Sequence, residues 1–349
     1  MDILTELIEA DDTKGLLRLV DGMCDTREWD ELVRVAEACR KAAERGRQLW
    51  PVSMHVEYRL ALEAPAEYAA AVVESDASRF TPGPLTEVAA SAHTWEELAP
   101  HAPSRNVAAI LAQERVLRGE DLTGDDRTAR EIFELPMCLD TAEFGYPPPV
   151  YKHDSAEFDD PGEPESAGGA SFNVDSGGAW RDVGVAEPGP LRLRAWRDLL
   201  ETWTAQSNAT VQVREVSGFG EEGRSEEAVS GAIAAHGLDA RACEISAGEA
   251  LGRMTWAAAS GAAHGRRRGG AAGRFGAWWC AATLLDLDWP PHEGFLDELG
   301  AAGWFWWEPV PRPAGWVFAL AVSDPASGWA GAVLAIDEVD DGTRPATGE

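Results

Sequence analysis

The sequence predicts an α+β protein. An all-helical N-terminal part, an irregular bundle or solenoid-like array, is followed by an α/β domain that ends in antiparallel strands. Three observations lead to this prediction. Apolar residues recur with a helical period of about 3.6 up to residue 135. A segment rich in Pro, Gly and acidic residues follows. Beyond residue 190, helical patterns alternate with short stretches of alternating polar and apolar residues, which are typical of strands.

Short helices separated by Pro or Gly make up the N-terminal part. Ala64-Pro65 and the turn FTPGPL interrupt the pattern, and Gly119 closes the last clear helix. Such short helices with brief breaks favour an α-solenoid or an irregular bundle; a HEAT-like array is one form of it, although no strict repeat is present. The apolar stripes lie in Ile3–Ile8, Leu16–Val20, Trp29–Val35, Val56–Leu62, Val72–Val73, Leu85–Ala92 and Val107–Val116.

Composition divides the chain into four segments. Residues 1–135 are the helical domain. Residues 136–189 are a linker or a long surface loop, because YPPPVYKHD and the acidic stretch after it contain few aliphatic residues. A functional lid has the same composition, but a flexible linker is the favoured interpretation. Residues 190–338 form the α+β domain, and we expect residues 339–349 to be a disordered acidic tail.

The second domain has the pattern of an antiparallel sheet covered by helices. Alternation in GWFWWEP places Trp304 and Trp306 on one face of a strand and Phe305 and Trp307 on the other. Core packing is favoured over an exposed platform for carbohydrate or peptide, because large aromatic residues are mostly buried. The expected helices are Leu191–Trp203, Glu226–His236, Gly248–Ala259 and Arg274–Leu285, and the expected strands are Thr210–Val216, Ala242–Ile245, Trp304–Trp307, Trp316–Val322 and Gly331–Ile336.

The charge of the chain limits its partners. The formal net charge of the 349 residues is -30 at pH 7. Nucleic acids and anionic membranes are therefore not expected as partners, because affinity for phosphate needs dense positive charge over a large face. Adaptation to high salt is an alternative explanation of the acidity. A local basic patch still allows a phosphate-bearing small ligand.

Cysteines and terminal patterns indicate a cytoplasmic protein without metal or cofactor. The five cysteines are scattered and form no CxxC pair, so free, mostly buried thiols are expected. No cluster of residues has metal-ligand spacing. The start of the chain, MDILTELIEADD, is acidic and amphipathic, unlike a secretory signal. No run reaches the roughly 18 apolar residues of a membrane span.

The most informative stretch is WAAASGAAHGRRRGGAAGRFGAWW, residues 256–279, which places four arginines in this acidic chain. Glycines around them allow sharp turns or close approach of the backbone. A helix that begins near Gly270 would direct its N-terminal amides toward an anion. The candidate binding residues are Trp256, Ser260, His264, Arg266, Arg267, Arg268 and Arg274.

Two interpretations of this stretch are open. In the first, which we favour, the arginines pair with an acidic partner protein or with an acidic surface of the other domain. In the second, guanidinium groups, His264 and an aromatic face such as Trp256 bind a small anion or a nucleotide, and this alternative includes an enzyme. The glycine spacing matches neither a P-loop nor GxGxxG, so it identifies no particular nucleotide.

Other candidates have no partners that the sequence identifies. His55 and Arg59 lie one turn apart on a predicted helix. For these two, and for His93, His101 and Glu114, a structural role is the default. The sequence contains no Ser-His-Asp order, GxSxG, HExxH or catalytic paired-carboxylate motif, so we expect no catalysis.

The arginine-rich stretch resembles a family of uncharacterised actinobacterial proteins of unknown function. The likeness extends over residues 190–340, and more faintly over the N-terminal helices. It implies a shared fold and an actinobacterial source, and no activity. We therefore expect an interaction or regulatory module. The residues that carry the resemblance are Trp256, Ser260, Gly261, His264, Gly265, Arg266, Arg267, Arg268, Gly269, Gly273, Arg274, Phe275, Ala277, Trp278 and Trp279.

Overall fold

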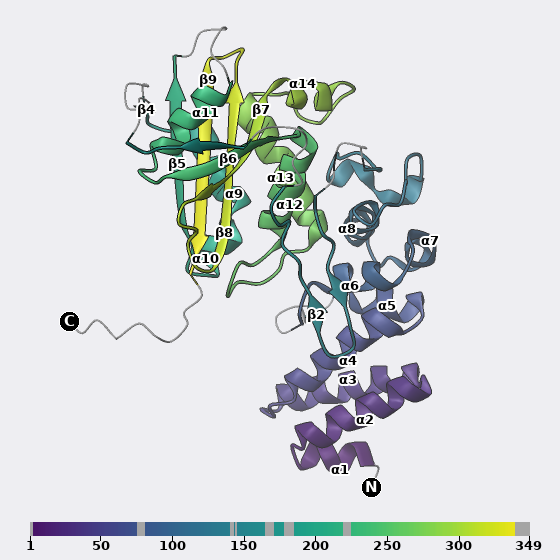
Figure 1. Ribbon diagram of the computed structural model, residues 1–349. Helices are drawn as coiled ribbons and strands as arrows, with labels where there is room; N and C mark the ends of the chain where they lie inside the picture. Colours follow the sequence, from purple (N-terminus) through teal and green to yellow (C-terminus); the bar gives the residue numbers. More distant parts are fainter. Residues whose placement is uncertain are drawn as a thin grey trace, which may run out of the picture. The chain divides into compact units, whose positions relative to one another are not determined.

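A computed structural model describes residues 3–74, 81–139, 143, 145–164, 171–177, 185–218 and 225–338 (Figure 1). The chain forms two compact units. Unit 1 comprises Met1–Cys138, Pro148–Asp159 and Gly269–Ala271, and unit 2 comprises Leu139–Pro147, Asp160–Arg268 and Ala272–Glu349. The fold is α+β, as the sequence predicts, with helices in unit 1 and an antiparallel sheet with helices in unit 2.

Unit 1 is built from short helices, each of which packs on helices close to it in the sequence (Figure 1). Aliphatic residues spaced along α2, α3 and α4 form one buried cluster with Ile8 of α1. The only strands described in this unit are β1 (Val150–Tyr151) and β2 (Ala156–Glu157), an antiparallel pair. The helices are α1 (Ile3–Glu9), α2 (Thr13–Thr26), α3 (Trp29–Glu44), α4 (Trp50–Glu63), α5 (Ala66–Val72), α6 (Leu85–Ala92), α7 (Trp95–Leu98) and α8 (Arg105–Val116).

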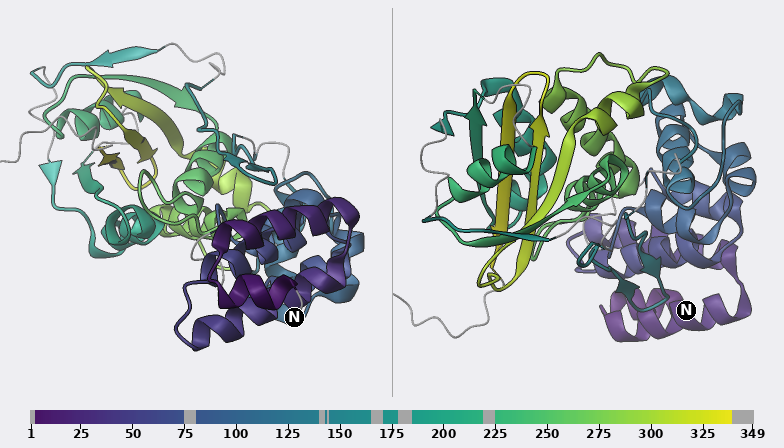
Figure 2. Two further views of the ribbon diagram at one scale, coloured as in Figure 1. Left: turned by 90° about the horizontal axis from the view of Figure 1, so that it is seen from below. Right: turned by 45° about the horizontal axis from the view of Figure 1, so that its top comes forward.

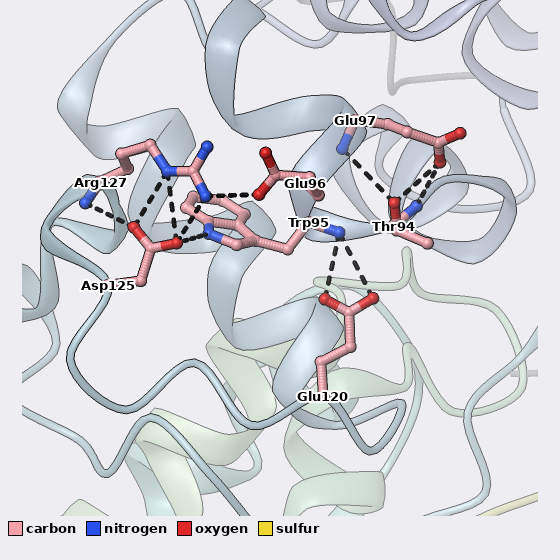
Figure 3. A network of polar contacts seen from close by, with 7 residues as sticks. All are labelled: Thr94, Trp95, Glu96, Glu97, Glu120, Asp125 and Arg127. Carbon is pink, nitrogen blue, oxygen red and sulfur yellow. Dashed lines mark hydrogen bonds and ion pairs between the residues drawn. The ribbon is translucent and has the colours of Figure 1, made fainter.

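A polar network fixes the start of α7 (Figure 3). Thr94 and Glu97 form a capping box, in which each side chain accepts from the backbone N–H of the other residue. The backbone N–H of Trp95 donates to the Glu120 carboxylate, and its indole N–H donates to Asp125 Oδ2 at 2.9 Å. These bonds tie the helix to the loop after α8.

Unit 2 contains a seven-stranded antiparallel sheet with the order β3-β6-β7-β8-β9-β5-β4. Figure 2 shows that the sheet curls strongly. The predicted linker segment contributes its two outermost strands, β3 and β4. The strands are β3 (Phe172–Val174), β4 (Val185–Ala186), β5 (Thr210–Ser217), β6 (Ala240–Ile245), β7 (Gly303–Pro309), β8 (Trp316–Asp324) and β9 (Trp329–Asp337).

Helices cover both faces of this sheet. On one face α11 packs against Phe305 and Trp307. On the other face, α9 packs against β5 and α12 against β7; Trp304 donates its indole N–H to Leu299 O of α14. The alternation predicted for β7 is therefore confirmed. The helices are α9 (Pro190–Leu199), α10 (Glu201–Ala205), α11 (Ser225–Ala234), α12 (Ala247–Ala259), α13 (Gly270–Leu285) and α14 (Phe295–Ala301).

Some element boundaries differ from the prediction. The helix expected over Leu191–Trp203 is divided at Leu200 into α9 and α10, and α14 was not predicted. Cys24, Cys39, Cys243 and Cys280 are buried thiols, and Cys138 is half-buried. Within the described ranges, no helix has the length and apolarity that crossing a membrane requires. Among the same residues, no three His, Cys, Asp or Glu side chains gather in a way that could hold a metal ion.

Candidate functional site

The arginine-rich stretch forms the loop between α12 and α13. Two glycines make this loop tight. The backbone N–H of Gly265 donates to Gly261 O at 2.7 Å, and a Cβ on either glycine would overlap the backbone of the other. The loop closes where the N–H of Arg268 donates to Ala259 O at 2.8 Å. The close backbone approach that the glycines predict is therefore confirmed.

A buried carboxylate anchors the loop to the end of β9. Asp337 is fully buried, and its Oδ2 accepts from the backbone N–H of Ala263 at 2.8 Å and from the hydroxyl of Ser207 at 2.5 Å. Its Oδ1 accepts from the N–H of Asn208 at 3.2 Å. The Ser207 hydroxyl in turn accepts from the N–H of His264 at 3.1 Å. The sequence gives no sign of this role, because Asp337 lies 74 residues from Ala263.

Exposure alternates along the loop. His264, Arg266 and Arg268 are exposed, whereas Gly265 and Arg267 between them are half-buried. We call the three exposed residues the basic edge. His264 belongs to the turn, and Arg266 and Arg268 lie in the irregular stretch that follows it.

The basic edge carries few internal ion pairs. Arg268 Nη1 lies 3.5 Å from Glu201 Oε2, and both side chains are largely exposed, so this pair is weak. The Arg266 side chain has no ion pair with any residue that the structure describes. Arg267, by contrast, turns inward, and its Nη2 donates to the hydroxyl of Tyr146 at 2.5 Å.

Arg274 is separate from the basic edge and lies inside unit 2. Its side chain is fully buried on α13, where Nε and Nη2 each donate to the Glu143 carboxylate at 2.7 Å. The indole N–H of Trp278 donates to the same carboxylate at 3.0 Å. Arg274 thus forms an ion pair with an acidic residue of its own unit. The pattern around Glu143 does not predict this pairing, because the two residues are 131 positions apart.

Trp256 and Ser260 belong to the framework behind the loop. Trp256 stacks on Trp316, with ring centroids 5.5 Å apart and planes inclined by 7°. The Ser260 hydroxyl donates to Ala257 O at 3.2 Å and accepts from the indole N–H of Trp203 at 3.2 Å. Both residues are buried. Of the seven predicted binding residues, the structure thus places only His264, Arg266 and Arg268 on an exposed edge.

The first two residues of α13, Gly270 and Ala271, belong to unit 1, and their amides meet two carboxylates of the same unit. The N–H of Gly270 donates to Glu87 Oε1 at 3.0 Å, and that of Ala271 donates to Glu114 Oε1 at 2.7 Å. Burial, reinforced by the negative charge of Glu87, raises the pKa of Glu114 to about 7. Arg118 Nη1 donates to Glu114 Oε2 at 2.9 Å and opposes this shift. The helix start does favour an anion, as predicted, and protein carboxylates supply it.

His55 and Arg59, one turn apart on α4, both lie close to an aspartate of α2. Asp21 Oδ1 of α2 lies 2.7 Å from Arg59 Nη1 and 3.6 Å from His55 Nε2. Burial and the Arg59 charge lower the pKa of His55. All three residues line a groove of about 680 Å³ in unit 1. His93 and His101 line a separate depression.

Fold and site together define a two-unit α+β protein with a tight, arginine-bearing loop. The chain belongs to the family described as "Family of unknown function (DUF6183)", which matches residues 14–328. Neither the curated proteins nor the solved structures include a match to the chain. The family therefore supports the shared fold and leaves the function to be inferred from the site.

Proposed function

We propose that this protein is an interaction or regulatory module whose basic edge docks an acidic segment of a partner protein. One observation carries the proposal. A loop made rigid by two glycines and a buried anchor, Asp337, exposes His264, Arg266 and Arg268 in alternation. A rigid loop loses little conformational entropy when a partner binds, so its side chains are already organised for recognition.

The spacing of the basic edge fits an extended acidic peptide. Carboxylates two positions apart in an extended peptide are separated by about 6.6 Å. Arg266 and Arg268 are also two positions apart and both exposed, so each can meet one of them. Planar guanidinium groups bind carboxylates through two parallel hydrogen bonds. The surrounding net charge of -30 disfavours other anionic contacts, which restricts binding to this edge.

The alternative, a small-anion or nucleotide site in the loop, has less support from the geometry. Arg274 is paired with Glu143, and Trp256 is stacked on Trp316. The Arg274 guanidinium and the ring face by which Trp256 stacks on Trp316 are thus both occupied inside unit 2. An extended surface contact suits the exposed side chains better than a pocket.

Fluorescence anisotropy with a labelled eight-residue peptide of alternating Glu and Ser tests the proposal. We expect saturable binding at low salt that weakens at about 300 mM salt, because exposed charge pairs are screened. The double variant R266A/R268A should bind roughly 5- to 30-fold more weakly, since each exposed pair contributes about 0.5–1 kcal/mol.

The matched control is R34A/R194A, which removes the same charge from two exposed arginines elsewhere. It should bind the peptide like the unaltered protein. Equal weakening by both double variants, or equal binding of a Gln and Ser peptide, would refute docking at the basic edge. A nucleotide or inorganic phosphate that raises the melting temperature, with loss of the effect in R266A/R268A, would favour the alternative.

A further inference from the structure

The pairing between β7 and β8 stops before either strand ends. The last paired residues are Trp306 and Leu320, while β7 continues to Pro309 and β8 begins at Trp316. Beyond Trp306 the two strands part, and β8 is paired there with β9 alone. A cavity of about 70 Å³ occupies this opening, and the segment Asp160–Glu163 also lines it.

Aromatic side chains form much of the cavity wall. Trp256 of α12, Trp306 of β7 and Phe318 of β8 all line it. Trp256 is 6% exposed and Phe318 is 4% exposed, so these surfaces are protected from bulk water. The volume accommodates about five water-sized groups. A ligand must therefore be small and must present a flat or apolar body to the rings.

Hydrogen-bond donors are in excess in this cavity. Arg253 is 6% exposed and has five N–H groups, of which two donate to Glu249 Oε1 and one to Gly162 O. Its other two N–H groups have no acceptor among the residues described. The same holds for the indole N–H groups of Trp256 and Trp306. Trp306 is half-buried, and an oxygen of a bound molecule would supply the acceptor that these donors lack within the protein.

Charge balance favours a neutral ligand over an anion. The Arg253 and Glu249 side chains are 2.9 Å apart at their closest atoms, and the Arg312 and Glu308 side chains 3.2 Å. Glu163, also in the lining, pairs with Arg241 at 2.8 Å. A carboxylate ligand would add uncompensated negative charge to these matched pairs. Arg253 already binds one neutral acceptor here, the backbone carbonyl of Gly162.

We infer that this cavity binds a small neutral amide, whose carbonyl oxygen accepts from Arg253 and the indole donors while its body packs on the aromatic wall. The inference is independent of the proposed docking function, because the cavity contains none of the three residues of the basic edge. A molecule of five or so non-hydrogen atoms binds weakly, so a dissociation constant on the order of 1 mM is expected.

Titration of the ¹⁵N-labelled full chain with N-methylacetamide, followed by NMR, tests this inference. W256F and W306F identify the two indole N–H signals, which should move saturably. Acetate at the same concentrations should move neither. W306F should weaken binding of the amide at least threefold as read on the Trp256 signal, whereas W279F, at a Trp that is 42% exposed on α13, should not.

Three results would overturn the inference: no saturable movement of either signal, equal weakening by W279F, or acetate binding as tight as that of the amide. R253K provides a second test, because it keeps a positive charge beside Glu249 but has fewer donors. It should also weaken amide binding at least threefold. The dispersion of its remaining NMR signals reports whether it folds.

Discussion

Arg274 and Glu143 form a two-point contact inside unit 2, with both hydrogen bonds at 2.7 Å. The Arg274 side chain is fully buried and that of Glu143 is 4% exposed. Two charges removed from water in this way stabilise a fold only while both are present, because each compensates the desolvation of the other.

E143Q should therefore destabilise the protein by about 3 kcal/mol, since it removes the negative charge that accepts two hydrogen bonds from the buried Arg274 guanidinium. Chemical denaturation measures the change. The matched control is E201Q, which removes the carboxylate of the exposed pair with Arg268 and should cost less than about 0.5 kcal/mol. Equal effects of the two variants would contradict this account of Arg274.

The shape of the basic edge depends on Gly261. A Cβ there would overlap the carbonyl of Gly265, so G261A should cost at least about 2 kcal/mol and displace the loop. G22A, in an open position on α2, should instead stabilise by about 0.5–1 kcal/mol. Denaturation midpoints of the two variants make the comparison; a neutral G261A would show that the loop is not tightly held.

Glu114 should bind its proton near neutral pH, with an NMR midpoint of its ¹³Cδ signal near pH 7 rather than 4.5. Its native pKa is raised, so its contribution to stability is complete below about pH 4.5 and is lost as the pH rises through 7. E87Q removes the neighbouring negative charge and should lower that midpoint. E227Q, at an exposed position of α11, should leave it unchanged.

His236 should show the opposite dependence on pH. Burial lowers its pKa to about 4, against an ordinary value of 6.5. Its contribution to stability is present above pH 6.5 and is lost as the pH falls toward 4. In H236F, which keeps a ring against Trp307, the loss of stability between pH 7 and 4.5 should be smaller by about 2 kcal/mol. Denaturation at both pH values provides the measurement, and an unchanged pH dependence would contradict it.

Periodicity predicts the regular elements well and the short strands poorly. The alternating run from Thr210 forms β5 as expected, with one residue more than predicted. Strands β3 and β4, of three and two residues, lie in a Pro- and Gly-rich segment. So short a strand has no measurable period, and the pairing of β3 with β6 and of β4 with β5 defines it instead.

The sequence identifies the arginine loop, but it does not predict which arginines are exposed and which form internal ion pairs. Glycines at 261 and 265 predict a tight backbone, and the structure has one. Which guanidinium is exposed depends on acidic partners far away in the sequence, such as Glu143 for Arg274. Spacing along the chain carries no information on such long-range pairs. The sequence therefore does not predict that Arg274 is buried and Arg266 exposed.

Strand β5 pairs along its whole length with β9, more than 100 residues later, and β9 in turn pairs with β8. During synthesis, β5 and β8 therefore present bare edges until residue 337 has left the ribosome. Nascent sheets with unprotected edges are prone to aggregation. The order of strands thus delays completion of the sheet until β9 has been synthesised.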